Sequence, residues 1–377
     1  MAQRPPKQEQ ERAGDVVTEV APGVLRAQLP IDMPGLGHVN CYVLEDERGA
    51  AIVDPGLAGS ASRRALKSRL ESAGIPLNRV HTVIVTHSHP DHFGAAGWLR
   101  HETGADIVTH RRFRLMWDPA EPPDVDVEEA VLDICGDGAR DTELGCDPGR
   151  DTTRAELAQR ARPRMPWDPA PWGGSGMTIP LRRRARLRLA AQFPRLLRVP
   201  VPSVRLDDAA TIRLARREWV ALHTPGHTED HLCLFDPADG VMLSGDHVLP
   251  TITPHIGGFG PFPDPLACFF DSLDKVATHG PDTSICLPAH GHPFTNLAGR
   301  VDAIKRHHRE RLDTLRAAVA GIGRPASVNE LSGHLFSARA QGAMADSETF
   351  AHLEHLRLAG EVARTDRSAG YAYAING

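Results

Sequence analysis

The chain has 377 residues, of which 41% are hydrophobic and 24% charged, a composition typical of a folded globular protein. Lys and Arg number 43 against 48 Asp and Glu, and the net charge of −5 does not favour nucleic acid or anionic lipid as a partner of the whole molecule. The six cysteines form no C-x-x-C pair, and no apolar stretch reaches roughly 18 residues. The N-terminus is polar and lacks the pattern of a secretory signal, so we predict a cytoplasmic protein outside the membrane.

In the first part of the chain, residues 1–15 are polar and predict a loose tail, after which short apolar runs alternate with turns. We predict strands over 39–44, 50–53 and 80–85, and helices over 60–73 and 94–102. Strands that alternate with helices in this way predict a layered α/β domain.

Residues 111–210 change in character and read as an insertion. Ten acidic side chains and one Arg lie within 118–143, and seven Arg lie within 181–198, where 181–193 predicts a helix with an imperfect apolar face. The simplest interpretation is a solvated insertion whose acidic and basic parts meet each other. The alternative is a lid or a substrate-binding element.

Regular structure resumes with predicted strands over 219–222, 232–235, 241–243 and 284–287. Helices are then predicted over 300–319, 327–336 and 347–358, the second capped by Ser327 or Asn329 and the third by Ser347. A hairpin over 361–365 and 371–375 completes a module that resembles a winged helix. The histidines on its helices are interpreted as surface residues, namely His307, His308, His352 and His355.

The strongest chemical signal is the sequence Thr86-His87-Ser88-His89-Pro90-Asp91-His92, directly after the predicted strand 80–85. Three imidazoles and one carboxylate on a single turn can supply ligands to one metal ion or to two. The cluster contains no Cys, which argues against a closed structural zinc site.

Three further candidate ligands each follow a predicted strand: His227 in Thr-Pro-Gly-His, Asp246 in Ser-Gly-Asp-His, and His290 in Pro-Ala-His-Gly. Strand ends that meet at one edge of a sheet bring together ligands from distant parts of a chain. Alone, His227 or His290 reads as a structural histidine, but the series in this order predicts a shared site.

The chain therefore resembles the metallo-β-lactamase-fold hydrolases, whose signature is H-x-H-x-D-H followed by single His, Asp and His ligands. This resemblance implies a four-layer α-β/β-α sandwich with two divalent metal ions at the edge of its sheets. By resemblance, His87, His89 and His227 hold the first ion, Asp91, His92 and His290 hold the second, and Asp246 bridges them. Asp54, in Val-Asp-Pro-Gly, matches a carboxylate that stands behind a ligand histidine of such sites and orients it.

Within that family, residues 224–235 and 244–249 look most like the branch that contains glyoxalase II, thioesterases and lactamase-like endoribonucleases. Members of this branch often carry a small C-terminal winged-helix-like domain. The resemblance thus implies a catalytic domain over 16–299, interrupted by the insertion, and a winged-helix-like domain over 300–377.

The implied chemistry is hydrolysis by a hydroxide that bridges two metal ions, with zinc as the expected metal and iron or manganese as alternatives. Asp91 is the predicted catalytic residue, because it can bind metal and also orient the nucleophile or pass its proton to the leaving group. His231 and His247 are the first choices for additional proton transfer or substrate contact. Cys233 is predicted to lie in the core.

We expect a small acyl substrate, an ester, thioester or lactone, covered by the aromatic residues of the insertion: Trp117, Trp167, Trp172 and Phe193. The alternative is an endoribonuclease that holds single-stranded RNA with the arginine-rich segment 181–217 and the C-terminal module. A non-catalytic DNA-binding regulator is a third hypothesis, which the few basic groups on helix 347–358 disfavour. Substrate identity, metal identity and homo-oligomer formation stay open.

Overall fold

A computed structural model describes residues 7–33, 35–115, 167–174, 179–193, 198–260 and 262–376 of the chain. Its first sheet has seven strands in the order β1-β2-β3-β4-β5-β6-β7. Strands β1 to β4 are antiparallel and β4 to β7 are parallel. Their bounds are β1 Thr18–Ala21, β2 Val24–Met33, β3 Leu36–Asp46, β4 Gly49–Val53, β5 Val80–Ile84, β6 Asp106–His110 and β7 Val204–Leu206. The three strands predicted here are confirmed within β3, β4 and β5.

The second sheet has five strands in the order β12-β11-β10-β9-β8, antiparallel except for the parallel pair β11 and β12. Its strands are β8 Thr211–Leu214, β9 Arg217–His223, β10 Leu232–Asp236, β11 Val241–Gly245 and β12 Ile285–Pro288. The four strands predicted in this part of the chain are confirmed. The prediction that Cys233 lies in the core is also confirmed, because the residue is fully buried in β10.

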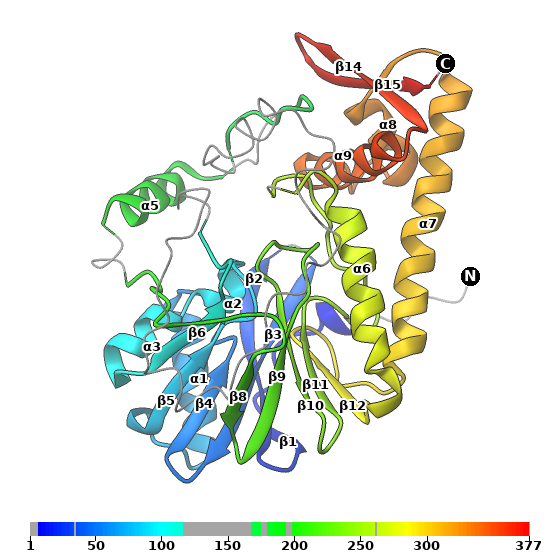
Figure 1. Cartoon of the computed structure of the whole chain (residues 1–377). Coiled ribbons are helices and arrows are strands. Elements are labelled where there is room, and N and C mark those ends of the chain that lie inside the picture. The colour runs from blue at the N-terminus through cyan, green and yellow to red at the C-terminus, as the bar shows by residue number, and fades with distance from the viewer. Residues whose placement is uncertain are drawn as a thin grey trace, which may run out of the picture.

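Helices cover the outer faces of both sheets (Figure 1). Helices α1 (Ser60–Ser72) and α3 (Ala96–Thr103) pack on the first sheet, and α6 (Pro265–Thr278) and α7 (Leu297–Ile322) pack on the second. A third set of buried side chains fills the space between the sheets, among them Tyr42, Leu44, Ile84, Trp219, Leu234 and Leu243. The four-layer α-β/β-α sandwich is therefore confirmed, and burial of apolar area in its three interfaces stabilises it.

The C-terminal segment contains α8 (Val328–Leu335), α9 (Ala343–Leu358) and a three-stranded sheet of β13 (Ala326–Ser327), β14 (Val362–Arg367) and β15 (Gly370–Ile375). Ser327 caps α8 as predicted, since its hydroxyl accepts a hydrogen bond from the Glu330 amide at 3.2 Å. Helix α9 begins four residues before Ser347, so the predicted cap there is wrong: the buried Ser347 hydroxyl instead accepts a hydrogen bond from the Gly258 amide. The winged-helix type stays a prediction.

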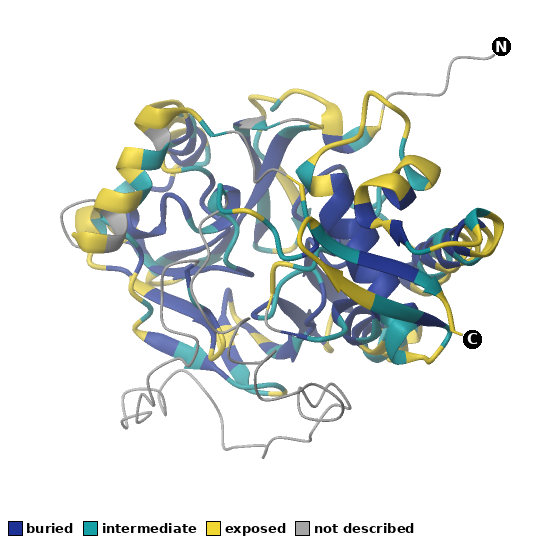
Figure 2. Ribbon diagram, turned by 90° about the horizontal axis from the view of Figure 1, so that it is seen from above, coloured by how far each residue is buried: buried dark blue, intermediate teal, exposed yellow. Residues whose placement is uncertain are grey.

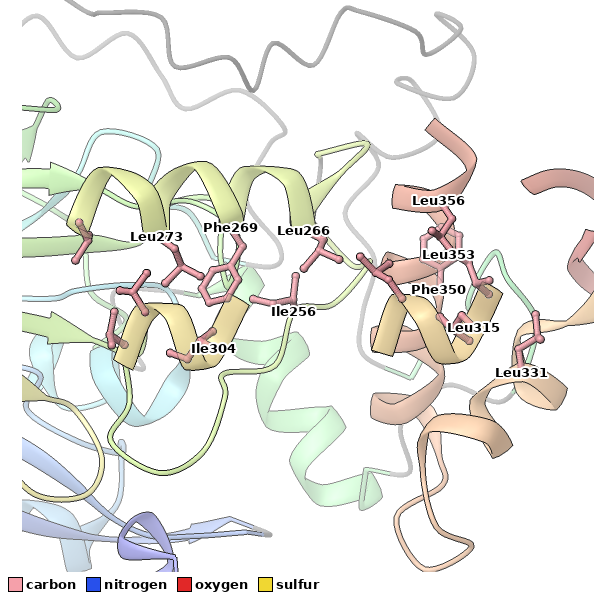
Figure 3. Packing of buried hydrophobic residues seen from close by; sticks show 14 of the residues in the cluster. Ile256, Leu266, Phe269, Leu273, Ile304, Leu315, Leu331, Phe350, Leu353 and Leu356 are labelled. Carbon is pink, nitrogen blue, oxygen red and sulfur yellow. The ribbon is translucent and has the colours of Figure 1, made fainter. Parts of the chain in front are cut away.

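Two of the four helical histidines are not surface residues. His308 on α7 and His352 on α9 are both fully buried, whereas His307 and His355 are half-buried. The surface interpretation is wrong for the first two because α7 and α9 pack against each other. Leu315 on α7 lies beside Phe350 and Leu353 on α9 (Figure 3).

Much of the insertion, including Trp117 and the acidic stretch, lies outside the described residues. The predicted helix is confirmed as α5 (Leu181–Gln192), which lies away from the sheets and is largely exposed (Figures 1 and 2). Trp172 is buried and stacks on Phe350 of α9, with ring centroids 4.4 Å apart. Its predicted role as part of a substrate cover is therefore wrong, because its ring belongs to the core under α9.

The N-terminal segment is also more ordered than a loose tail. Residues Gln8–Gln10 form one 3-10 turn, and Glu9 is fully buried. Its carboxylate accepts hydrogen bonds from the amides of Thr251 at 2.8 Å and Ile252 at 3.1 Å. The prediction of a loose tail is thus wrong for residues 7–11, since backbone donors compensate the buried charge. No helix among the described residues is long and apolar enough to cross a bilayer.

Candidate metal centre

All seven predicted ligands lie at one edge of the sandwich, on loops that directly follow strands. His87, His89, Asp91 and His92 follow β5, the last two on the short helix α2 (Pro90–Phe93). The other three ligands follow β9, β11 and β12, in the order His227, Asp246 and His290. The strands belong to the two hydrogen-bonded sheets, so they fix where each loop begins.

The ligand atoms fall into two adjacent groups. His87, His89, His227 and Asp246 form the first, and Asp91, His92 and His290 form the second; within each group the atoms lie within 4.8 Å of one another. Asp246 reaches both groups, because its Oδ2 lies 3.5 Å from His227 Nε2 and its Oδ1 lies 3.3 Å from His290 Nε2. This is the position that a bridging carboxylate requires.

Four inward-facing polar atoms of this site have no hydrogen-bond partner among the described residues: the Nε2 atoms of His87, His92 and His290, and Oδ1 of Asp246. All four are buried, and an unpaired buried polar atom costs roughly 1–3 kcal/mol. Several such atoms converging on one point are explained if cations bind between them. The donor set of imidazole and carboxylate therefore fits divalent metal ions.

Hydrogen bonds behind the ligands hold the imidazoles in place. The Nδ1 atom of His227 donates to the carbonyl of His255 at 2.7 Å, and that of His290 donates to the carbonyl of His38 at 2.6 Å. Each bond fixes the tautomer in which Nε2 carries a lone pair and faces the site.

Asp54 plays the same part for His92, whose Nδ1 donates to Asp54 Oδ2 at 2.8 Å. The Thr86 amide and hydroxyl donate to the same carboxylate at 2.9 and 2.8 Å, and the Thr86 hydroxyl in turn lies 3.0 Å from His87 Nδ1. Asp54 has a φ of +54°, a conformation that Asp tolerates better than most residues. One buried carboxylate thus contacts His92 of the second group directly and His87 of the first group through the Thr86 hydroxyl, whereas the resemblance implies a contact with a single ligand histidine.

Replacing Asp54 with Asn is expected to weaken Zn²⁺ binding about 10- to 100-fold, because the neutral amide loses the charge that orients the His92 ring and increases its basicity. Competition between metal-free protein and a chromophoric chelator measures this affinity. The exposed Asp282→Asn variant is the matched control and should bind like wild type. Equal affinity of Asp54→Asn and wild type would contradict the role of Asp54.

Burial and mutual contacts set the charges of the ligands. Burial lowers the pKa of His87 well below its usual value, and the neighbouring imidazoles of His92 and His89 lower it further. Burial alone would raise the pKa of Asp246, but His290 and His92 outweigh it and hold this pKa well below its usual range. Burial would also lower the pKa of His92 and His290, but the neighbouring carboxylates outweigh it and raise both. The first group therefore offers a neutral His87 and an ionised Asp246, whereas metal binding at the second group would displace protons from His92 and His290.

His231 and His247 lie behind the ligands. His231 Nε2 accepts a hydrogen bond from the Asp246 amide at 3.0 Å, and its Nδ1 lies 2.7 Å from the Thr224 hydroxyl. His247 is fully buried against Phe269 of α6, and burial lowers its pKa to about 3. Both rings are therefore placed to support the loops, and the expectation that they transfer protons or touch substrate is not supported by these positions.

Two of the residues that sequence reasoning missed at this site act through their backbone. His38 and His255 supply the two carbonyl acceptors, and a carbonyl is present in every residue, so no side-chain pattern marks it. Asp230 was missed as well: its buried carboxylate accepts from the hydroxyl of Ser88, between two ligands, and burial raises its pKa to about 7.

Two solved structures resemble the whole chain. A β-lactamase domain protein from Burkholderia ambifaria is 28% identical, with a TM-score of 0.67 over 97% of this chain and 96% of that one. A metallo-β-lactamase family protein from Thermus thermophilus is 27% identical, with a TM-score of 0.65 over 95% of this chain and 100% of that one.

Curated relatives include the probable metallo-hydrolase YqjP of Bacillus subtilis, 22% identical over 85% of this chain and 88% of its own. An atrochrysone carboxyl ACP thioesterase of Emericella nidulans is 29% identical over 26% of this chain, and the match spans only 28% of that relative's length. A hydroxyacylglutathione hydrolase of Albidiferax ferrireducens is 32% identical over 28% of this chain and 34% of its own.

The model of the metallo-beta-lactamase superfamily matches residues 34–318, a range that holds all seven candidate ligands. Together with the four-layer sandwich and the two groups of converging His and Asp side chains, this match shows that the chain belongs to the metallo-beta-lactamase superfamily of metal-dependent hydrolases.

Proposed function

We propose that the chain is a hydrolase with two divalent metal ions, zinc by preference, that cleaves an ester, thioester or lactone. The observation that carries this proposal is the convergence of seven candidate ligands, five of them buried, four of whose polar atoms are unpaired among the described residues. The bound ions would lower the pKa of water and polarise a carbonyl oxygen, so that the protein needs no Ser or Cys nucleophile.

The chain's own residues have distinct parts in this proposal. The histidines would bind the metal ions, and the hydrogen bonds from His227 and His290 to backbone carbonyls keep their rings from turning. Asp91 Oδ2 lies 3.5 Å from His290 Nε2 and 3.6 Å from His92 Nε2, at the edge of the second group. A carboxylate there can accept the proton of the attacking water and return it to the leaving group.

An apolar recess suited to an acyl chain has a lining that includes Pro30, Ile31 and Leu57, none of which is a candidate ligand. The segment that carries Leu57 is joined to the turn between α2 and α3, since the Gly56 carbonyl accepts from the Ala95 amide at 2.9 Å. One of the relatives is a thioesterase by name and another is named a hydroxyacylglutathione hydrolase, which favours the thioester among the three bonds.

The endoribonuclease alternative is weaker because many arginines in 181–217 have partners within the chain. Arg217 is buried in an ion pair with Asp236, and Arg205 donates to the carbonyls of Arg111 and Phe113. Arginines paired in this way contribute less to binding of an RNA backbone.

A substrate survey tests the proposal. Metal-free protein and protein reloaded with Zn²⁺, Fe²⁺ or Mn²⁺ are assayed on ester, thioester, lactone and single-stranded RNA substrates. We expect turnover of a carbonyl substrate that chelation abolishes and metal restores. If RNA is the substrate cleaved and no carbonyl substrate is, the endoribonuclease alternative replaces this proposal. If the metal ions support turnover of none of these substrates, the proposal is overturned.

A further inference from the structure

Helices α7 and α9 bring together a second set of metal-binding side chains, outside the centre described above. His308 lies on α7, and Glu348 and His352 lie one turn apart on α9. His308 and His352 are fully buried and Glu348 is 9% exposed. One donor atom from each residue lies within 4.8 Å of the other two.

We propose that His308, Glu348 and His352 bind a Zn²⁺ ion of their own. Two imidazoles and one carboxylate are a donor set that zinc accepts, with a fourth position left for water. The packed helices fix the donors, since Leu315 of α7 lies beside Phe350 and Leu353 of α9 (Figure 3).

The two imidazoles have the arrangement found at the sheet-edge centre. His352 Nδ1 donates to the Glu348 carbonyl at 2.7 Å, which leaves its Nε2 with a lone pair 3.0 Å from His308 Nδ1. At the sheet edge, His227 Nδ1 likewise donates to a backbone carbonyl at 2.7 Å, and its Nε2 lies 3.0 Å from His89 Nδ1. In both places a backbone acceptor points one imidazole at another, with a carboxylate beside them.

Burial keeps these imidazoles neutral. It lowers the pKa of His352 to about 4 and that of His308 well below its usual value. A hydrogen bond from His308 Nδ1 to His352 Nε2 is the arrangement that competes with metal, and it would satisfy one nitrogen of each ring.

Neighbouring charges limit how tightly the ion binds. The Arg311 guanidinium lies 3.3 Å from Glu348 Oε1, and His255 Nδ1 lies 3.3 Å from Glu348 Oε2. The positive charge of Arg311 beside the only carboxylate of the trio repels a bound Zn²⁺ ion. We therefore expect weaker binding here than at the sheet edge, where two carboxylates serve the ions.

The ion would join α9 to α7 and, through Glu348, to the loop that orients a ligand of the catalytic centre. His255 contacts Glu348 through its side chain and accepts from His227 through its carbonyl. This site is therefore placed to stabilise the C-terminal helices against the loop that supports His227.

Zinc stoichiometry of the full-length protein tests the inference. Metal-free protein is titrated with Zn²⁺, freed of excess by desalting, and analysed by mass spectrometry of the metal. We expect about three equivalents per chain in wild type and about two in His308→Gln and in His352→Gln, because each variant removes one ligand of the proposed site. His307→Gln and His355→Gln change half-buried histidines outside the trio on the same two helices, and they should keep the third equivalent.

The wild-type measurement does not depend on whether a variant folds. At most two equivalents in wild type, or a third equivalent that survives in both His308→Gln and His352→Gln, would overturn the inference. The Asp246→Asn variant separates it from the proposed function: the sheet-edge ions should be lost and about one equivalent should remain. An Asp246→Asn protein that binds no zinc refutes the α7–α9 site and leaves the catalytic proposal standing.

Discussion

Asp246→Asn is expected to lose the metal ions of the sheet-edge centre together with its hydrolytic activity. The carboxylate stands between the two groups of ligands, 3.5 Å from His227 Nε2 and 3.3 Å from His290 Nε2. Asn keeps the shape but removes the charge that both ions would share. Bound metal contributes several kcal/mol to transition-state stabilisation, so turnover should fall about 1,000-fold or more.

Metal analysis and kcat/KM on the best substrate of the survey measure this effect. Asp302→Asn, an exposed carboxylate on α7, is the control and should match wild type in both. Circular dichroism shows whether the variant is folded. A folded Asp246→Asn protein with wild-type metal content and turnover within about tenfold of wild type would contradict the bridging role.

The candidate ligands could be proposed from the sequence because each is a charged or imidazole side chain shortly after a predicted strand. Val80–Ile84 marks the strand before His87, and Val241–Gly245 ends one residue before Asp246. Strand ends converge at a sheet edge whatever the loop lengths between them, so local sequence suggests which side chains meet, while their division between two metal ions came from the resemblance.

Buried polar residues away from the strands were not predictable. Helix α9 is enclosed on nearly all sides, so Ser347, Glu348 and His352 are buried although their polarity suggests a surface. Glu9 is also buried, because the amides of Thr251 and Ile252 donate hydrogen bonds to its carboxylate. Polarity predicts exposure only where the tertiary structure offers no hydrogen-bond partner for the buried group. A partner 242 residues away in the chain leaves no local signal in the sequence.

Strands were missed where polar residues interrupt the apolar pattern. In β2, Arg26 and Gln28 alternate with Ala27 and Leu29, which are fully buried. Alternation of this kind is typical of a strand with one face toward a helix layer, yet small Ala and the proline at position 30 weaken the signal.

Asp91→Asn is expected to separate catalysis from metal binding at the first group. Asp91 belongs to the second group only, within 3.6 Å of His92 Nε2 and His290 Nε2, so the four ligands of the first group are unchanged. Asn cannot accept a proton, and loss of a positioned general base lowers turnover by about 100- to 10,000-fold.

Metal content, kcat and KM of Asp91→Asn should therefore differ from those of Asp246→Asn. We expect about half of the sheet-edge metal to remain and the loss to fall on kcat rather than KM, because substrate contacts away from Asp91 are intact. Asp302→Asn again serves as the control. If Asp91→Asn keeps kcat within about tenfold of wild type, Asp91 holds metal without moving protons, and another group at this sheet edge must accept the proton of the attacking water.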